Sequence, residues 1–295
     1  MKPSSSTTPN LSASAHLVAL YRALESERPD ALFEDPYARR LAGTLGVALA
    51  QVMGNLYHTS NSIAVRTYLI DAMILDLLAS DPVDIIINLG AGLDTRPYRL
   101  SLPSSLCWIE VDLPELLSYK EKQLNDIEPV CRVERVTLDL HDIEQRRSLF
   151  ETLNIGSQRI LILAEGLLGY FRPEQVVTLA QDLHRYPNFQ WWLFELISLP
   201  AEHQLPQSRS LFRQVDRHFG AGQPAFQFLP EEGTQFFYPY GWRVAESRSI
   251  LDEMEQLNRA TFLARLWKSL SRWIYKETWQ TFRQQASIVL MERTD

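Results

Sequence analysis

A turn with two glycines follows a short apolar run in the first third of the chain. The run at residues 85–89 begins with three isoleucines, which is typical of a buried parallel strand. Gly90 and Gly92 lack a Cβ, so the backbone can turn sharply there and a ligand can approach it closely. Thr95 and Pro97 favour a helix start, with the threonine hydroxyl as its cap. Strand, glycine turn and helix together predict the ligand-binding unit of a doubly wound α/β protein.

Asp94 narrows the choice of ligand at this turn. The third glycine of the dinucleotide-binding fingerprint is absent, and the Asp94 carboxylate would repel a phosphate. The same carboxylate suits a cationic cofactor. S-adenosylmethionine (SAM) has a sulfonium and an ammonium group and no phosphate, so we include Gly90, Gly92 and Asp94 among its expected contacts. An ordinary strand-to-helix turn without a ligand is the alternative.

Four successive expected strands end in acidic residues. Asp112 ends the strand at 106–112, twenty residues after Gly92, where an acid can accept hydrogen bonds from both ribose hydroxyls. It could instead cap the next helix. Asp139, Glu165 and Glu195 end the expected strands at about 131–138, 159–164 and 190–195. Ligands of open α/β sheets bind outside the carboxyl ends of the strands, so this acidic rim favours a cation.

Arg66 lies on the apolar face of an expected amphipathic helix at residues 61–79. It precedes Ile70 by four residues and therefore shares its stripe. The stripe contains Ile70, Met73, Ile74 and Leu77. An arginine that faces a core must find an anion. That anion could belong to a structural ion pair, or it could be a ligand carboxylate such as the methionine end of SAM.

The segment after the third expected strand reads Asp139-Leu140-His141-Asp142. The Asp139 carboxylate can accept a hydrogen bond from an adenine amino group, while Leu140 packs on the ring. Asp139, His141 and Asp142 could alternatively bind a divalent metal. Hard-cation sites usually gather more carboxylates from separate elements, so we expect no metal.

Composition limits the class of protein. The chain has 295 residues, of which 45% are hydrophobic and 22% charged, and its formal net charge is −7. We find no basic stripe, so nucleic acid is not an expected partner. Cys107 and Cys131 fall in expected strands and suit buried thiols in a reducing compartment, which favours the cytoplasm. There is no secretory signal and no apolar run of about 20 residues, so we expect no membrane association.

The expected organisation is an α/β domain with two additions. Residues 1–14 form a disordered tail, and residues 15–80 form an N-terminal helical cap with a break at residues 28–30. Residues 81–295 form the α/β domain, which includes an aromatic-rich lid at about 198–240. A strand at 242–250, a helical stretch at 251–282 and a reversed last strand at 286–291 complete it.

With these residues placed, the chain resembles the leucine carboxyl methyltransferase family in its broad sense, especially the bacterial O-methyltransferases of polyketides and related natural products. The resemblance covers most of residues 15–195. It is found at residues 28–36 (RPDALFEDP), 66–67 (RT), 89–96 (LGAGLDTR), 110–114 (EVDLP), 139–140 (DL) and 164–170 (AEGLLGY).

The resemblance implies a class I SAM-dependent methyltransferase fold, which is Rossmann-like with a seven-stranded doubly wound sheet. It implies that Arg66 binds the methionine carboxylate and that Gly90 lies against the cofactor. It further implies that Asp112 binds the ribose, that Asp139 and Leu140 contact the adenine, and that Glu165 lies near the methionine end.

We therefore expect a SAM-dependent O-methyltransferase that acts on a carboxyl or hydroxyl oxygen of a small, largely apolar natural product. A hydroxyl acceptor would benefit from a base. The candidates are His141, Tyr170, His203 and His218. The alternatives are methylation of a protein C-terminal carboxylate, an NAD-dependent oxidoreductase, and a non-catalytic SAM-fold subunit. The sequence leaves open the acceptor, the choice between carboxyl and hydroxyl methylation, and the oligomeric state.

Overall fold

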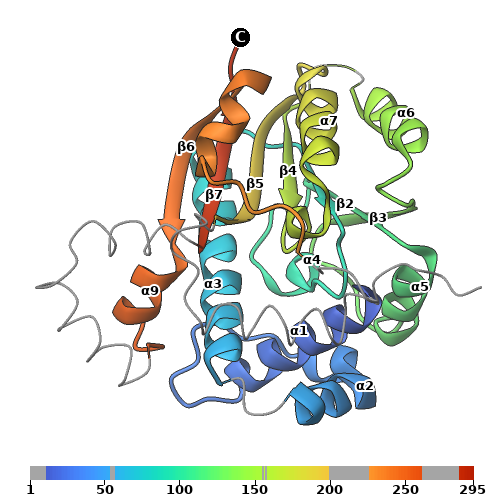
Figure 1. Ribbon diagram of the computed structural model, residues 1–295. Helices are drawn as coiled ribbons and strands as arrows, with labels where there is room; N and C mark the ends of the chain where they lie inside the picture. Colours follow the sequence, from blue (N-terminus) through green and yellow to red (C-terminus); the bar gives the residue numbers. More distant parts are fainter. Residues whose placement is uncertain (1–10, 54–56, 155, 157, 199–225, 261–285) are drawn as a thin grey trace, which may run out of the picture.

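A seven-stranded sheet forms the centre of the molecule (Figure 1). The computed structural model describes residues 11–53, 57–154, 156, 158–198, 226–260 and 286–295. The strand order is β3-β2-β1-β4-β5-β7-β6. The strands are β1 Ile85–Leu89, β2 Cys107–Asp112, β3 Arg132–Thr137, β4 Ile160–Ala164, β5 Phe189–Ile197, β6 Trp242–Ser249 and β7 Ala286–Arg293.

The strand directions place a ligand crevice at the middle of the sheet. Strands β1 to β5 are parallel, whereas β7 runs antiparallel to both β5 and β6, which confirms the expected reversed last strand. From β1 the chain proceeds outward through β2 to β3 and then returns to β4 on the other side. The carboxyl ends of β1 and β4 therefore border the switch point at which open α/β sheets bind their ligands.

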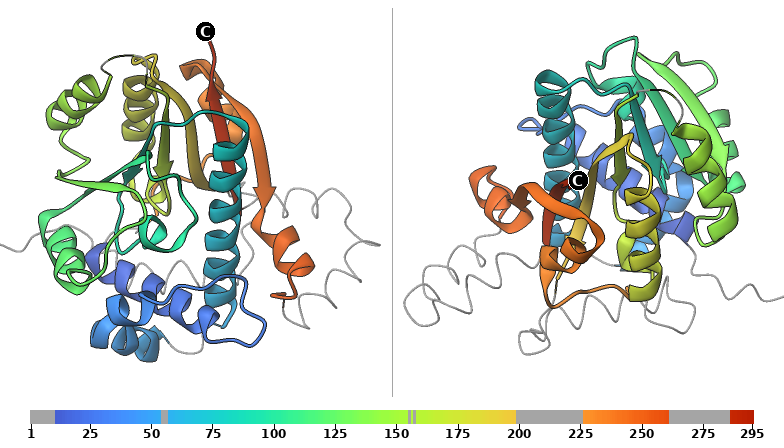
Figure 2. Two further views of the ribbon diagram at one scale, coloured as in Figure 1. Left: turned by 180° about the vertical axis from the view of Figure 1, so that it is seen from behind. Right: turned by 90° about the horizontal axis from the view of Figure 1, so that it is seen from above.

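Helices cover both faces of the sheet. Strands β1 and β4 are buried at every position, which explains their continuous apolar sequences. Helices α3 Tyr57–Ser80 and α9 Ile250–Gln256 pack on one face, and α6 Ile143–Leu153 and α7 Pro173–His184 pack on the other (Figure 2). Each face has its own apolar core, so the fully buried Trp108 and Trp192 belong to different clusters.

A helical cap lies against the carboxyl ends of the strands. It consists of α1 Leu11–Ser26 and α2 Ala38–Met53. Their apolar side chains pack on the loop after β1, on α4 Arg96–Arg99 and on α5 Pro114–Gln123. The expected break falls between α1 and α2. Helix α1 begins at Leu11, so residues 11–14 are helical, whereas the sequence suggested a tail to residue 14; residues 1–10 lie outside the described part.

Part of the expected lid belongs to the core. Residues 233–240 form a 3₁₀ helix, η3 Gly233–Tyr240, and Phe237 within it is fully buried against Trp192 and Phe194. The remainder of the lid at 199–225, and most of the helical stretch expected at 251–282, lie outside the described residues. The helices that the structure describes include none with the length and apolar character needed to span a membrane.

Candidate functional site

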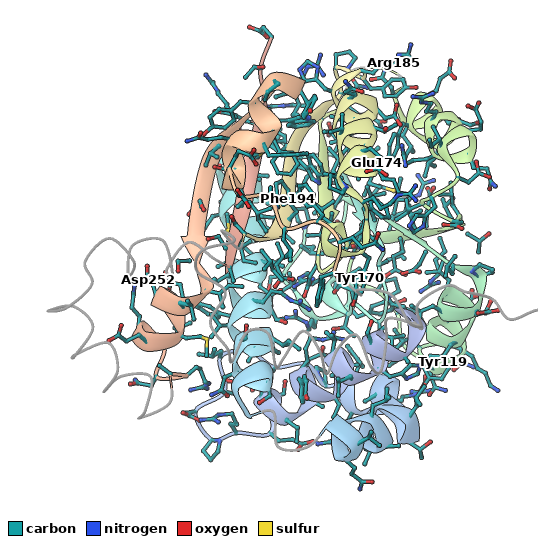
Figure 3. The ribbon with its side chains drawn as sticks, viewed as in Figure 1. Tyr119, Tyr170, Glu174, Arg185, Phe194 and Asp252 are labelled. Atoms are coloured by element: carbon teal, nitrogen blue, oxygen red, sulfur yellow. The ribbon has the colours of Figure 1, made fainter. Side chains whose placement is uncertain are left out.

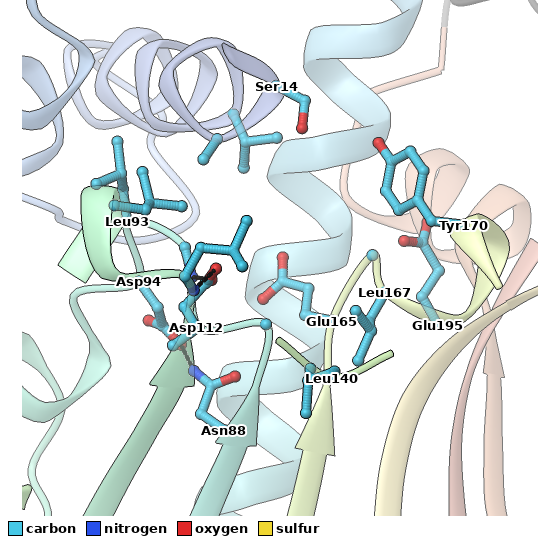
Figure 4. A pocket seen from close by; sticks show the side chains of 18 of the residues that line it. Ser14, Asn88, Leu93, Asp94, Asp112, Leu140, Glu165, Leu167, Tyr170 and Glu195 are labelled. Atoms are coloured by element: carbon cyan, nitrogen blue, oxygen red, sulfur yellow. Dashed lines mark hydrogen bonds between the residues drawn. The ribbon is translucent and has the colours of Figure 1, made fainter. Parts of the chain in front are cut away.

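A cavity of about 810 Å³ opens at the switch point between β1 and β4. The glycine turn after β1, the ends of β2 to β5 and the first turns of α1 line it. Figure 4 shows Asp112, Leu140, Glu165 and Glu195 around this cavity, with Ser14 of α1 opposite them. Every expected cofactor-binding residue lines it: Arg66, Gly90, Gly92, Asp94, Asp112, Asp139, Leu140 and Glu165. Its volume is in the usual range for a small-molecule site.

The glycine turn is closed by the acid at the end of β2. Gly90 and Gly92 have φ angles of +68° and +51°, which L side chains rarely adopt, so both positions favour glycine. The Gly92 N–H donates to Asp112 Oδ2 at 2.7 Å, and the Leu113 N–H donates to Asp112 Oδ1 at 2.7 Å. Burial raises the pKa of Asp112, although these amide bonds oppose the shift. The carboxylate keeps acceptor capacity toward the cavity, which a diol would satisfy.

Arg66 is an ion-pair partner of two carboxylates. Its Nη1 donates to Glu195 Oε2 at 2.7 Å, and its Nε lies 2.9 Å from Glu165 Oε1. The Nε–H nevertheless has no hydrogen-bond acceptor among the described residues, because it is not directed at the Glu165 oxygen. The structure therefore contains the ion pair that was one interpretation of Arg66.

Arg96 joins three carboxylates below the cavity floor. Its side chain is 2% exposed, and it bonds Asp71 at 2.7 Å, Asp94 at 2.8 Å and Glu165 at 2.7 Å. Asp94 also accepts from Asn88, the bond drawn in Figure 4, and from the Arg96 backbone N–H. Burial acts to raise the pKa of Asp94, but the charges of Arg96, Lys120 and Arg22 and the bond from the Arg96 backbone N–H together outweigh it, so the pKa lies well below its ordinary value.

These pairs belong to one chain of alternating charges that extends from the cap to β5. Arg22 of α1 pairs with Asp35 at 2.8 Å, and Arg99 lies 3.8 Å from Asp35 and 2.6 Å from Asp71. The network contains five carboxylates and four guanidinium groups, so its formal charge is −1. Its members are Arg22, Asp35, Arg99, Asp71, Arg96, Asp94, Glu165, Arg66 and Glu195.

The network changes two details of the sequence interpretation. The Thr95 hydroxyl was expected to cap α4, but it donates to Asp35 at 2.6 Å, and Asp94 accepts from the Arg96 N–H instead. The acidic rim is present, but Glu165 and Glu195 are already paired with arginines. Asp112 and Asp139 are the rim carboxylates without an arginine or lysine ion-pair partner among the described residues.

His141 and Asp139 form a pair at the edge of the cavity. His141 Nδ1 lies 3.0 Å from Asp139 Oδ1, so Nε2 is the proton acceptor in the tautomer in which Nδ1 donates. The imidazole packs edge-on against Phe171, with ring centroids 4.8 Å apart, while Leu140 is buried beside it. No group of three His, Cys, Asp or Glu residues in the described ranges is arranged to hold a metal ion.

Tyr170 lines the cavity at its end close to α1. It belongs to η1 Leu168–Tyr170, lies between the sheet and α1 (Figure 3), and points its hydroxyl toward Ser14 (Figure 4), with which it hydrogen-bonds. Its ring stacks on that of Phe226, with centroids 5.3 Å apart and planes at 27°. Burial raises the pKa of Tyr170, so the phenol is protonated at neutral pH. His203 and His218 lie outside the described residues.

Several cavity residues were not identified from the sequence as site residues, including four from segments outside the α/β strands. Ser14, Val18 and Arg22 come from α1, and Phe226 comes from the described end of the expected lid. Ser14 falls in the expected tail. Arg22 gives a weak signal, because a buried arginine in an N-terminal helix requires an anion, but the sequence does not indicate that Asp35 supplies it.

Comparison with known proteins identifies the family. The leucine carboxyl methyltransferase family model matches residues 15–184, which is more than half of the chain. A protein of Mycolicibacterium vanbaalenii, named a candidate SAM-dependent methyltransferase, is 26% identical over 263 residues, or 82% of this chain and 79% of its own length. One of the same name from Mycobacterium sp. strain KMS is 31% identical over 56% of this chain, and the matched region spans 59% of that relative.

Solved structures share the fold. A candidate methyltransferase from Thermobifida fusca YX is 15% identical, with a TM-score of 0.59 over 99% of this chain and 97% of that one. A DUF574 family protein from Streptomyces avermitilis MA-4680 is 12% identical, with a TM-score of 0.59 over 96% and 97% of the two chains. The expected class I methyltransferase fold with its seven-stranded sheet is thus confirmed. The chain belongs to the leucine carboxyl methyltransferase family.

Proposed function

We propose that this chain transfers the methyl group of SAM to an oxygen of a small, largely apolar natural product. Its family membership and the methyltransferase names of its relatives support methyl transfer from SAM. The observation that carries the proposal is the cavity at the switch point. It combines the glycine turn, the Asp112 carboxylate and Arg66 with aromatic side chains at its other end.

The residues present fit SAM better than a nucleotide phosphate. Among the described residues, six acids and two arginines line the cavity. Both arginines are paired with carboxylates, so a phosphate would meet net negative charge. Asp112 would accept from the ribose hydroxyls, Asp139 and Leu140 would contact the adenine, and Arg66 and Glu165 would hold the methionine end.

When bound, SAM supplies an electrophilic methyl group on a positively charged sulfur. The chain's own contribution is to align the acceptor oxygen with that methyl group and to exclude water. The ion-pair network holds α1, the glycine turn and the strand ends in one rigid arrangement, because each guanidinium bonds groups from different elements. In a displacement that breaks one bond and forms another, such precise placement contributes most of the rate acceleration.

A hydroxyl acceptor would also need to lose a proton. His141 is our first candidate base, because it lines the cavity and its Nδ1 contact with Asp139 leaves Nε2 as the acceptor when Nδ1 carries the proton. Tyr170 is protonated and therefore serves as a donor to the acceptor oxygen, not as a base. His203 and His218 remain candidates. If the acceptor is a hydroxyl, at least one of the three His→Ala changes should lower turnover without weakening SAM binding.

Two further parts of the proposal concern location and organisation. Cys107 and Cys131 are both free, and burial raises the pKa of Cys131 to about 11, so it is a protonated thiol suited to a reducing compartment such as the cytoplasm. We also propose that the chain is organised as an N-terminal helical cap followed by a SAM-binding α/β domain with a lid. The cap is more than an addition, because α1 supplies part of the cavity wall.

Calorimetric titration with S-adenosylhomocysteine, with NAD as a parallel titrant, tests the cofactor assignment. Asp112→Asn keeps an oxygen that can accept from the Gly92 N–H but removes the charge, and Asp126→Asn is an exposed control. We expect binding of S-adenosylhomocysteine alone and a loss of roughly 10-fold or more in Asp112→Asn, since a hydrogen bond to a charged group contributes about 1.5–3 kcal/mol. NAD binding, or no binding of either ligand, would reject the proposal.

A further inference from the structure

Arg146 of α6 is a buried guanidinium to which the proposed function gives no role. It is 2% exposed and is not among the residues that line the cavity. Its Nη1 donates to the Leu140 carbonyl at 2.8 Å, and its Nη2 donates to Asp182 Oδ2 of α7 at 2.6 Å. Leu140 lines the cavity, so this arginine connects the cavity wall with the two helices behind it.

The loop at residues 138–142, between β3 and α6, depends on the bond from Arg146. The Asp139 carbonyl accepts from the Asp142 N–H at 2.8 Å, and Asp139 Oδ1 accepts from the His141 N–H at 2.9 Å. The Leu140 carbonyl lies between these bonds and accepts from the guanidinium. A buried carbonyl without a donor costs as much as a lost hydrogen bond, so without the arginine this peptide group would turn toward another donor. The side chains on either side of it would then change direction.

Helix packing alone does not account for the buried ion pair. Phe150 of α6 and Leu183 of α7 are both fully buried and belong to the same apolar core. Burying an ion pair costs desolvation energy that such apolar contacts avoid. Asp182 is 3% exposed and holds the guanidinium of Arg146 in the place from which Nη1 reaches the loop. Arg147 bonds the same carboxylate at 2.8 Å, but its side chain is 41% exposed.

We propose that Arg146 is a positioning residue for the cofactor: through the Leu140 carbonyl it holds the loop at residues 138–142 in the arrangement that recognises adenine. This inference rests on the proposed function, in which Asp139 accepts from the adenine amino group and Leu140 packs on the ring. Because Arg146 acts through the loop, its loss should change the choice of base. A residue with a merely structural role would lower stability and leave that choice unchanged.

Calorimetric titration with S-adenosylhomocysteine and S-inosylhomocysteine tests the inference. The second ligand has a carbonyl oxygen in place of the adenine amino group and is otherwise closely similar. We expect the wild-type protein to bind S-adenosylhomocysteine roughly 10-fold or more tightly, because the amino group donates to the charged Asp139 and the oxygen cannot. In Arg146→Met this ratio should fall to about 3-fold or less, as it should in Asp139→Asn, which removes the charged acceptor itself.

Arg147→Met is the matched control. It removes an arginine from the same Asp182 carboxylate, but Arg147 has no hydrogen bond to the loop among the described residues, so the wild-type ratio should persist. Arg146→Met in turn leaves Asp182 paired with Arg147, so no buried charge is left without a partner.

Arg146→Lys provides the test if Arg146→Met does not fold. It keeps a positive charge beside Asp182, but one ammonium replaces two nitrogens that bridge separate groups, so the ratio should again fall. A wild-type ratio in Arg146→Met, or in Arg146→Lys where Arg146→Met does not fold, overturns the inference. An equal fall in Arg147→Met overturns it as well.

The same titrations separate this inference from the proposed function. Failure of S-adenosylhomocysteine to bind the wild-type protein would reject the cofactor and hence the methyltransferase proposal. Binding of S-adenosylhomocysteine with no preference over S-inosylhomocysteine, or with a preference that the Arg146 variants retain, would leave the cofactor in place and reject the role of Arg146 alone.

Discussion

At the scale of single residues, Arg96 shows why a buried charge can be required without touching a ligand. It is 2% exposed, and Asp71, Asp94 and Glu165 bond it from three elements. A buried carboxylate without a counter-charge is costly. Asp94 has no other ion-pair partner among the described residues, whereas Asp71 also pairs with Arg99 and Glu165 with Arg66. Burial acts to raise the pKa of Glu165, but Arg96 and Arg66 outweigh it, and the pKa lies below its ordinary value.

Arg96→Met should therefore destabilise the protein by about 3–5 kcal/mol at pH 7, because it leaves the buried Asp94 without its ion-pair partner and removes one of two partners from Asp71 and Glu165. In the wild type the lowered pKa values add stability that is present above the ordinary carboxyl pKa and lost as pH falls through the folded value. In the variant, burial without the guanidinium raises these pKa values, so protonation relieves the unpaired charges at mild acidity. The deficit should shrink between pH 7 and pH 5.

Urea denaturation at the two pH values measures this difference. Arg132→Met is the matched control, since Arg132 pairs with Glu134 on the surface and is 73% exposed. It should change stability by less than about 1 kcal/mol at either pH. A deficit in Arg96→Met that is the same at pH 7 and pH 5 would show that packing, not charge, is responsible.

At the scale of elements, the entry into β6 depends on a glycine. Gly241 has a φ angle of +82°, and a Cβ there would overlap the imidazole of His184 at the end of α7. His184 in turn lies 3.0 Å from the Thr294 carbonyl, just beyond β7. This contact ties the edge of the sheet to the helix that covers it.

Gly241→Ala should cost more stability than Gly156→Ala, its matched control. Both glycines have positive φ angles, but a Cβ at Gly156 would meet nothing within 4 Å. Each substitution should cost roughly 1–2 kcal/mol of backbone strain, and Gly241→Ala should cost a further 1–3 kcal/mol for the overlap with His184. Urea midpoints of the two variants test this, and equal losses would contradict it.

The sequence predicts the elements better than their contacts. The strands β1, β2, β4 and β5, helix α3 and the reversed β7 follow from apolar runs and periodicity, because burial on a known face leaves that pattern. The bounds of helices α5 and α6 were not predicted, since their apolar residues are few and their charged residues many. The rim positions of Asp112 and Glu165 follow from strand ends. The partner of Arg66 does not, because Glu195 is 129 residues away and only the sheet order brings them together.

At the scale of the whole molecule, the cap and the later part of the chain are joined by a buried ion pair. Glu25 of α1 is 3% exposed, and its Oε1 accepts from Arg259 Nη2 at 2.5 Å. Arg259 also donates to the Asp30 carbonyl, and its own carbonyl accepts from Asn61 of α3. Helix α1 supplies Ser14 and Arg22 to the cavity, so this junction supports the wall of the site from a distance.

Glu25→Gln and Glu27→Gln are a matched pair that tests the junction. Glu25→Gln removes a buried charge opposite Arg259 and should cost about 3 kcal/mol or more. Glu27 pairs with Arg39 at 2.6 Å, but both side chains are about half exposed, so its loss should cost less than about 1 kcal/mol. Urea denaturation measures the difference, and hydrogen exchange should show lower protection of α1 in Glu25→Gln alone.

Since α1 forms one wall of the cavity, the same variant should bind S-adenosylhomocysteine more weakly. Equal effects of the two changes would mean that the cap is held by its apolar contacts with α4 and α5 and not by the Glu25–Arg259 pair.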